Sequence, residues 1–376
     1  MMPYDVIIVG GGLAGLVSAV HLSKKGLSVL LIEKHEYPKH KVCGEYISNE
    51  VLSYLKALGF DPFIYGAKNI VKLTLSTPQS RSVSTKLPFG GFSISRYCID
   101  WELSKMAKQN GAEIRHVTVS DIQFKDNCFQ VFTNQDEKYT AELVIGSFGK
   151  RSNLDVKMNR DFIKKASPFL GVKAHYKGEF PDDAVGLHNF EGGYCGISKV
   201  ETDLVNVCYI VDFKSFKQYK NIDDFQKKVL SENKYLKEVF ATHELAFEKP
   251  LAISQVSFSA KQPVENHILM CGDSAGMIHP LAGNGMSMAI RAAQMASLQI
   301  LKFKSGRIKS RKDLESQYRK IWNKEFSSRL KSGHVIARLF DLGLFSELLM
   351  LFLKTFPFLL PHIIKKTHGK PMKAEL

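Results

Sequence analysis

Two glycine-rich segments, far apart in the chain, hold the residues whose spacing points most clearly to chemistry. The first follows the apolar run 6–9, reads Gly10-x-Gly12-x-x-Gly15, and leads into apolar residues at helical spacing. This order predicts a strand, a tight turn and a helix whose free N–H groups could bind a pyrophosphate. Gly10 permits the turn, Gly12 lets a phosphate approach the backbone, and Gly15 lets the helix pack on the strand. The segment therefore predicts a dinucleotide site.

An acidic residue follows at the position where ribose hydroxyls would bind. A second apolar strand, from Ser28, ends at Glu33, about 20 residues beyond the glycines. A carboxylate there favours an adenosine without a 2′-phosphate, but NAD and FAD share this ADP half. The residues that we expect to contact the dinucleotide here are Gly10, Gly12, Leu13, Ala14, Gly15, Glu33, Lys34 and Lys41.

The second segment, 271–285, decides between the two dinucleotides by resemblance. It carries a Gly-Asp pair after an apolar strand and Gly-Asn-Gly before a long helix, and it resembles glutathione-reductase-type flavoproteins of the para-hydroxybenzoate hydroxylase and geranylgeranyl reductase superfamily. The resemblance implies that Asp273 holds the ribityl or phosphate part of FAD. It also implies that the loop 280–285 lies against the isoalloxazine, where a helix N-terminus stabilises negative charge on the reduced ring. The implied contacts are Gly272, Asp273, Pro280, Gly283, Asn284, Gly285 and Met286.

Two shorter matches lie between these segments. Arg96-x-x-x-Asp100-x-x-Leu103 resembles a helix of the same superfamily in which the arginine contacts FAD. Lys41-Val-Cys43-Gly-Glu resembles the Lys-Pro-Cys-Gly-Gly stretch of geranylgeranyl reductases and its Cys-Gly-Glu variant, a loop that lies beside the flavin. Cys43 is therefore a candidate catalytic thiol. The alternative is an inert packing residue, since cysteine is often buried.

The segments 192–197 and 205–207 resemble strands that line the substrate cavity of geranylgeranyl reductases. The resemblance places Tyr194, Cys195, Gly196 and Asn206 at that cavity. This chain has Gly196 in place of a tryptophan, and 198–199 in place of Phe-Pro. These replacements weaken the case for an isoprenoid substrate.

This chain also lacks motifs that related flavoproteins use for reduction by NAD(P)H and for halogenation. Group A monooxygenases carry, where this chain has Phe148, an Asp that helps to handle FAD and the nicotinamide nucleotide. The electron donor is therefore left open between NAD(P)H and another reductant. Flavin halogenases of this fold carry Trp-x-Trp, whereas the only tryptophans here are Trp101 and Trp322, so halogenation is not expected. No His and Cys group has zinc-like spacing, and no metal is expected.

The resemblance implies an α/β fold with three parts. A Rossmann-like FAD-binding domain of the glutathione-reductase type is expected from 1–75, 93–160 and 255–305, and an inserted, mainly antiparallel substrate domain from 76–92 and 161–254. Strands are predicted near 169–176, 184–190 and 204–211. A basic, hydrophobic helical tail is expected from 306–376. His175 and His188, inside the substrate domain, are assigned no chemical role.

The strongly positive net charge suggests an anionic partner. Lys and Arg number 52 against 37 Asp and Glu, a net charge of +15, and much of the excess lies late in the chain. The apolar run 339–364 is interrupted by Glu347, Lys354 and two prolines, too often for a transmembrane helix. Residues 335–373 suit an interfacial helix on anionic lipid, with helices that cap the substrate domain as the alternative. Nucleic acid is not expected as a partner.

Free cysteines and the absence of a signal peptide predict a cytoplasmic protein, with peripheral binding to the inner face of the membrane as a further expectation. The oligomeric state is left open.

The function expected is that of an FAD-dependent oxidoreductase acting on a hydrophobic aromatic, polyketide-like or isoprenoid-like small molecule. Hydroxylation through a C4a-hydroperoxyflavin is favoured by the missing cavity aromatics, whereas Phe148 argues the other way. The alternative is hydride transfer to a C=C bond, with Cys43 completing the protonation. A third hypothesis is a non-enzymatic prenyl or lipid carrier, against which the complete set of FAD-type residues argues.

Overall fold

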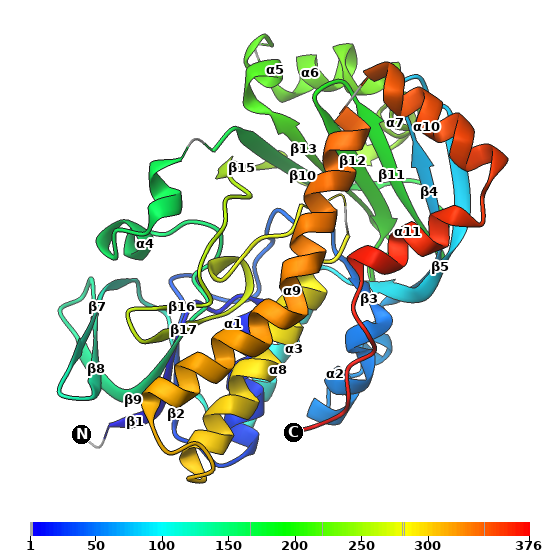
Figure 1. Ribbon diagram of the computed structural model, residues 1–376. Helices are drawn as coiled ribbons and strands as arrows, with labels where there is room; N and C mark the ends of the chain where they lie inside the picture. The colour runs from blue at the N-terminus through cyan, green and yellow to red at the C-terminus, as the bar shows by residue number, and fades with distance from the viewer. Residues whose placement is uncertain (1–2, 166, 220, 280, 282, 342) are drawn as a thin grey trace.

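A computed structural model describes residues 3–165, 167–219, 221–279, 281, 283–341 and 343–376 (Figure 1). Its first sheet has eight strands in the main order β16-β17-β9-β1-β2-β6, with β1 (Tyr4–Val9) parallel to both neighbours. Val6, Ile7 and Ile8 are fully buried, because helices and loops cover both faces of such a sheet. The other strands are β2 (Val29–Ile32), β6 (Glu113–Arg115), β7 (Val119–Lys125), β8 (Cys128–Thr133), β9 (Lys138–Gly146), β16 (Val264–Glu265) and β17 (Ile268–Met270).

Four long helices belong to this first layer. α8 packs against α1, and α1 against α3. α9 lies along α8, and its Leu314 and Tyr318 complete the same core (Figure 1). The helices are α1 (Leu13–Lys24), α3 (Arg96–Gln109), α8 (Gly285–Lys304) and α9 (Arg311–Asp341), with the short α2 (Leu52–Leu58) and α4 (Asn153–Lys157) beside them.

The second sheet has nine strands in the main order β14-β10-β13-β12-β11-β4-β5-β3, and β15 also pairs with β10. All its pairings are antiparallel except β11 with β4, so the mainly antiparallel sheet expected from the sequence is confirmed. Its strands are β3 (Tyr46–Ser48), β4 (Lys68–Ser76), β5 (Ser82–Ser93), β10 (Phe169–Lys177), β11 (Ala184–Phe190), β12 (Gly193–Lys199), β13 (Val205–Asp212), β14 (Glu244–Leu245) and β15 (Leu251–Val256). The helices α5 (Phe213–Lys217), α6 (Ile222–Lys228) and α7 (Lys234–Thr242) lie between β13 and β14 in the chain.

The division into segments differs from the expected one at two points. β3 and β4 belong to the second sheet, although we placed residues 1–75 in the FAD-binding domain, and β15 crosses the expected boundary at 255. β4 pairs in parallel with β11, a partner far along the chain that local sequence patterns cannot reveal. Side chains strengthen the pairing, because Ser76 Oγ lies 2.9 Å from His188 Nδ1.

His188 should make stability depend on pH. Burial lowers its pKa to about 4, below the ordinary value of 6.5, so the unfolded chain takes up a proton that the folded chain refuses. The free energy of unfolding should therefore fall by about 2 kcal/mol between about pH 6.5 and pH 5 on account of this residue. Urea unfolding of His188→Gln at both pH values should show a shallower fall than the wild type. The exposed His116→Gln is the control, and an equal fall in both variants would contradict the assignment.

The C-terminal tail is helical, as expected. α10 (Gly343–Thr355) and α11 (Leu359–Thr367) cover the part of the second sheet formed by β4 and β5 (Figure 1). Met350, Leu353 and Leu360 are buried against Ile70 and Leu73. Among the described residues no single helix is long and apolar enough to cross a membrane, although α10 and α11, bent by 120°, meet the length and composition criteria together.

Candidate active site

The two glycine-rich segments meet at one edge of the first sheet. β1 and β17 both pair in parallel with β9, so their carboxyl ends lie at the same edge. A Cβ atom added to Gly272 would lie 3.3 Å from that of Ala14, at the start of α1. This edge is where open α/β sheets bind their ligands.

The three glycines of the first segment have the properties that phosphate binding requires. Gly10 has a φ of +103°, and a Cβ there would lie 2.4 Å from the Ser147 carbonyl oxygen. A Cβ on Gly15 would lie 2.1 Å from the Gly10 oxygen, so any side chain would push α1 off the strand. Gly12 faces open space, with Arg96 Nη2 at 3.8 Å as the nearest atom, and no side chain caps α1. A pyrophosphate could therefore reach the free N–H groups of Leu13 and its neighbours.

Glu33 directly follows β2 and is buried beside the glycine turn. Its Oε2 accepts a hydrogen bond from the Gly11 N–H at 2.7 Å, which fixes the carboxylate where a ribose would lie. Lys34 is exposed next to it. Lys41 Nζ approaches the Gly11 oxygen at 3.4 Å and pairs with Asp100 at 2.8 Å.

Arg96 is held in place over the turn. Its guanidinium makes two bonds to Asp100, of 2.9 and 2.7 Å, one helical turn later. Burial would raise the pKa of Asp100, but Arg96 and Lys41 outweigh burial and keep this pKa below its usual value. The guanidinium thus stays charged and aligned beside Gly12, as a cation that contacts the dinucleotide should.

The second segment supplies the other half of the site. Burial raises the pKa of Asp273, although the nearby cations Lys261, Arg96 and Lys150 counteract it. Asn284 precedes α8 without capping it and donates to the Thr367 oxygen at 2.8 Å. Its buried Oδ1 has no hydrogen-bond partner among the described residues. The N–H groups at the start of α8, from Gly285 and Met286 onwards, thus have no side-chain cap to compete with a ligand. Gly283 has a φ of +63° and lies against the Tyr46 ring. Pro280 lies outside the described residues.

Cys43 lies beside this loop. Its Sγ is 3.5 Å from Sδ of Met286, and its carbonyl oxygen accepts a bond from Asn206 Nδ2 at 3.3 Å. Burial raises the pKa of the Cys43 thiol, so the group is protonated at neutral pH. Cys43, Met286 and Asn206, which come from separate parts of the sequence, thus lie close together.

The residues of β12 that were predicted to line the cavity lie on two different faces of this strand. Tyr194 packs with Val256 and Leu281, the latter in the loop before Gly283, and Gly196 is on the same face of β12. Cys195 is on the opposite face, buried among Phe190 and Tyr209 in the core of the second sheet. Its placement at the cavity was wrong, because side chains alternate along a strand.

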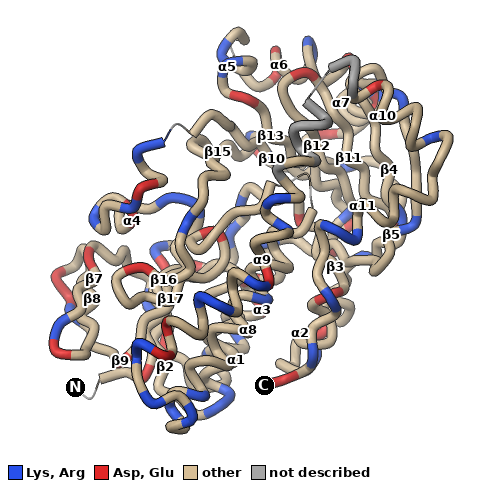
Figure 2. The backbone as a smooth tube through the Cα atoms, in the orientation of Figure 1, with Lys and Arg blue, Asp and Glu red and all other residues tan. Residues whose placement is uncertain are grey.

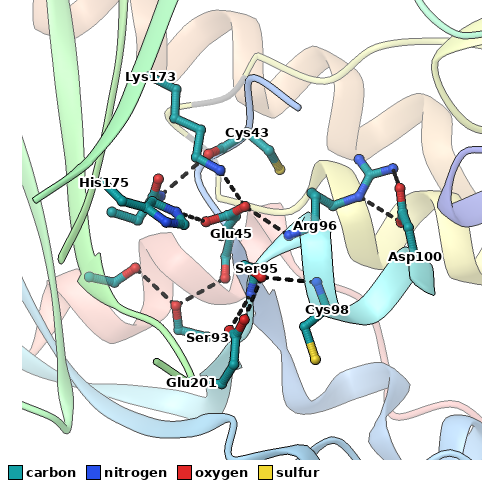
Figure 3. A network of polar contacts seen from close by, with 12 residues as sticks. Cys43, Glu45, Ser93, Ser95, Arg96, Cys98, Asp100, Lys173, His175 and Glu201 are labelled. Atoms are coloured by element: carbon teal, nitrogen blue, oxygen red, sulfur yellow. Dashed lines mark hydrogen bonds and ion pairs between the residues drawn. The ribbon is translucent and has the colours of Figure 1, made fainter. Parts of the chain in front are cut away.

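The structure reveals a buried charge cluster that the sequence analysis missed (Figure 3). Lys173 Nζ and His175 Nε2 both bond the carboxylate of Glu45, the latter at 2.7 Å. The Arg96 N–H donates to the same carboxylate at 2.8 Å. Glu45, two residues after Cys43, therefore links β10 of the second sheet to α3, the helix that begins at Arg96.

Glu45 adopts a backbone conformation that normally favours glycine. Its φ is +56°, at a position where geranylgeranyl reductases have glycine. Keeping a larger residue there costs about 1–2 kcal/mol, which the three bonds to its carboxylate offset. Burial would raise the pKa of Glu45, but Lys173 and His175 outweigh it and lower the pKa. The sequence did contain a detectable signal, because Lys173 and His175 lie on one face of β10 between mainly apolar residues.

These features fit FAD. The open backbone at Gly12, two helix N-termini without side-chain caps, Glu33 and the unpartnered Asn284 oxygen provide the donors and acceptors that the dinucleotide needs. Gly10, Gly12, Gly15, Glu33, Arg96, Gly272 and Asp273 would hold it along the sheet edge, and the loop to Gly285 would face the flavin.

Comparison with known proteins supports FAD as the cofactor. A model of the FAD binding domain family matches residues 3–318. The conditioned medium factor receptor 1 of Dictyostelium discoideum is 24% identical over 91% of this chain and 70% of its own length. Digeranylgeranylglycerophospholipid reductase 2 of Methanothermobacter thermautotrophicus is 24% identical over 90% of this chain and 88% of its own.

Solved structures share the fold. The flavin-dependent brominase Bmp2 superposes with a TM-score of 0.81 at 19% identity, covering 99% of this chain and 95% of its own. A geranylgeranyl bacteriochlorophyll reductase-like protein from Thermoplasma acidophilum gives a TM-score of 0.73 at 18% identity, covering 91% and 88%. The chain belongs to the FAD binding domain family and is an FAD-dependent oxidoreductase.

Proposed function

We propose that this oxidoreductase saturates C=C bonds of a polyprenyl-type lipid. The observation that carries the proposal is the position of Cys43, whose Sγ lies 3.5 Å from the Met286 sulfur at the start of α8. Burial raises the pKa of this thiol, which favours its protonated form. A double bond that accepts a hydride also needs a proton, so a donor must lie within reach of the substrate at the flavin. A thiol can act as this general acid.

In the proposed reaction the cofactor and the protein have separate roles. When bound, reduced FAD supplies a hydride to one alkene carbon. Cys43 donates its proton to the other carbon, so the double bond becomes single and the thiolate is reprotonated from solvent. Burial and the charge of Glu45 raise the pKa of Cys43, whereas Arg96 and, more weakly, Lys173 lower it. The two cations therefore offset part of the cost of forming the transient thiolate. A nicotinamide nucleotide or another electron donor must reduce the flavin beforehand.

The similarity to digeranylgeranylglycerophospholipid reductases, over about nine tenths of both chains, supports a lipid substrate with double bonds. Hydroxylation is the second candidate. Gly196 stands where geranylgeranyl reductases have a tryptophan, and an aromatic substrate could occupy the space that this side chain leaves. Both candidates use the same flavin, so the product distinguishes them.

The test uses the FAD-loaded protein, a chemical reductant and digeranylgeranylglyceryl phospholipid in detergent, with mass spectrometry of the product. The proposal predicts a gain of paired hydrogen atoms. Cys43→Ser should lower the rate by about 10²–10⁴-fold while FAD content is unchanged, because a hydroxyl is a far weaker acid. Cys128→Ser, in β8 of the other sheet, is the matched control. Incorporation of oxygen would establish hydroxylation instead, and an unchanged rate in Cys43→Ser would exclude the thiol as the donor.

A further inference from the structure

We propose that the outer surface of α10 and α11 docks on an anionic membrane, from which the lipid substrate reaches the flavin. We call this surface the membrane face. Its apolar residues are strongly exposed: Leu348 at 64%, Leu351 at 50%, Phe352 at 49%, Phe356 at 40% and Phe358 at 63%. The inference rests on the proposed function for the identity of the substrate, but not for the docking itself.

Packing against the second sheet buries only part of the apolar surface of α10 and α11. Met350, Leu353, Leu360 and Ile364 already bury one side against β4 and β5. The exposed leucines and phenylalanines lie on the other side and at the turn between the helices, which projects at the edge of the molecule (Figure 1). Large apolar residues gathered in this way on a surface mark an interaction site.

The charges next to the membrane face select the partner. Residues 348–374 contain five lysines and no aspartate or glutamate. The nearest preceding acid, Glu347, is buried and pairs with Arg81 at 3.3 Å. Lys354 on α10 and Lys365 and Lys366 on α11 are exposed, and Figure 2 shows basic segments along both helices. Exposed aromatic and aliphatic side chains bordered by lysines fit the headgroup region of anionic lipid.

The shape of the hairpin fits shallow insertion. α10 has 13 residues and α11 has nine, each shorter than the roughly 20 that a spanning helix needs. The 120° bend between them turns the chain back, so the phenylalanines at the turn are the natural point of entry into the bilayer surface.

The membrane face is connected to the flavin loop. The carbonyl oxygen of Thr367, at the end of α11, accepts the bond from Asn284, which precedes Gly285. Tyr46 packs in the same apolar cluster as Leu360 and Ile364, and its ring lies 3.7 Å from a Cβ built on Gly283. Apolar side chains therefore run from beneath the hairpin to the predicted flavin position.

The test is sedimentation of the full-length, FAD-loaded protein with vesicles of phosphatidylcholine and phosphatidylglycerol. Phe356→Ser/Phe358→Ser should weaken binding by about tenfold or more. Each lysine should contribute about fivefold to vesicle binding at low salt, so Lys365→Gln/Lys366→Gln should weaken binding by about 25-fold there. The loss should be smaller at high salt. The matched controls are Phe213→Ser, an exposed phenylalanine on α5, and Lys227→Gln/Lys228→Gln on α6, all of which should bind as the wild type does.

Three results would overturn the proposal. The first is that the wild type does not bind vesicles, and the second is that none of the membrane-face variants changes vesicle binding. The third is a dimer in solution that the phenylalanine variants dissociate while vesicle binding persists, which would make the face a subunit interface. FAD content, read from flavin absorbance in every variant, separates failure of docking from failure of the flavin site.

Discussion

Replacing Glu45 by alanine should lower the free energy of unfolding by about 3–5 kcal/mol. The substitution leaves the fully buried Lys173 without its counter-charge and removes the acceptor for His175 and for the Arg96 N–H. Chemical unfolding at neutral pH measures the effect. FAD affinity should fall as well, because Glu45 fixes the start of the helix that carries Arg96.

The control for Glu45 is an exposed ion pair. Glu244→Ala removes the partner of Lys177, 3.7 Å away on the surface, and should cost less than about 1 kcal/mol. The double variant Glu45→Leu/Lys173→Leu should lose less free energy of unfolding than Glu45→Leu and Lys173→Leu lose together. The reason is that the double variant leaves no unpaired buried charge. Equal losses for Glu45→Ala and Glu244→Ala would show that the cluster is not a stabilising unit.

The same cluster predicts a pH dependence. Because the folded-state pKa of Glu45 is depressed, its contribution to stability is present above the unfolded value of about 4.5 and is lost as the pH falls through the folded pKa. Glu45→Gln, which cannot titrate, should therefore lose less stability than the wild type on acidification. A parallel acid response in both proteins would contradict this sign.

Replacing Gly12 by valine should weaken FAD binding by about 100-fold or more. The side chain would fill the space beside Arg96 through which a pyrophosphate reaches the α1 N–H groups, and losing two charge-assisted bonds costs about 3 kcal/mol. The backbone of Gly12, with a φ of −79°, accepts a side chain without strain. Titration of the apoprotein with FAD, followed by flavin fluorescence, measures the loss.

Gly15→Val separates cofactor binding from folding. Its side chain would collide with the Gly10 backbone oxygen, 2.1 Å from the Cβ position, so this variant should lose both FAD and thermal stability. Gly12→Val apoprotein should melt within a few degrees of the wild-type apoprotein. Full FAD retention in Gly12→Val would refute the placement of the pyrophosphate.

Much of the flavin-binding half could be predicted because its signals are local. The run from Val6 to Gly15 contains strand, turn and helix within one short segment, and each glycine has its own steric reason. The family resemblance supplied the second segment and Arg96. These residues meet in space because parallel strands bring their carboxyl ends to one edge.

The features that the sequence did not reveal depend on distant pairing. β4 joins the second sheet through β11, and Glu45 finds Lys173 and His175 on β10, which no local pattern specifies. Lys173, at an internal position of an apolar strand, was nevertheless a usable signal, because a buried lysine needs a counter-charge.

The most direct test of the account is anaerobic mixing of the dithionite-reduced, FAD-loaded protein with digeranylgeranylglyceryl phospholipid, followed by flavin absorbance. Without oxygen, the flavin can return to its oxidised form only if the lipid accepts its electrons. The account predicts reoxidation at a rate that depends on lipid concentration, lost in Gly12→Val and slowed in Cys43→Ser. A flavin that stays reduced until oxygen is admitted, and then reoxidises with oxygen incorporated into an added lipid or aromatic compound, would contradict C=C reduction and establish hydroxylation.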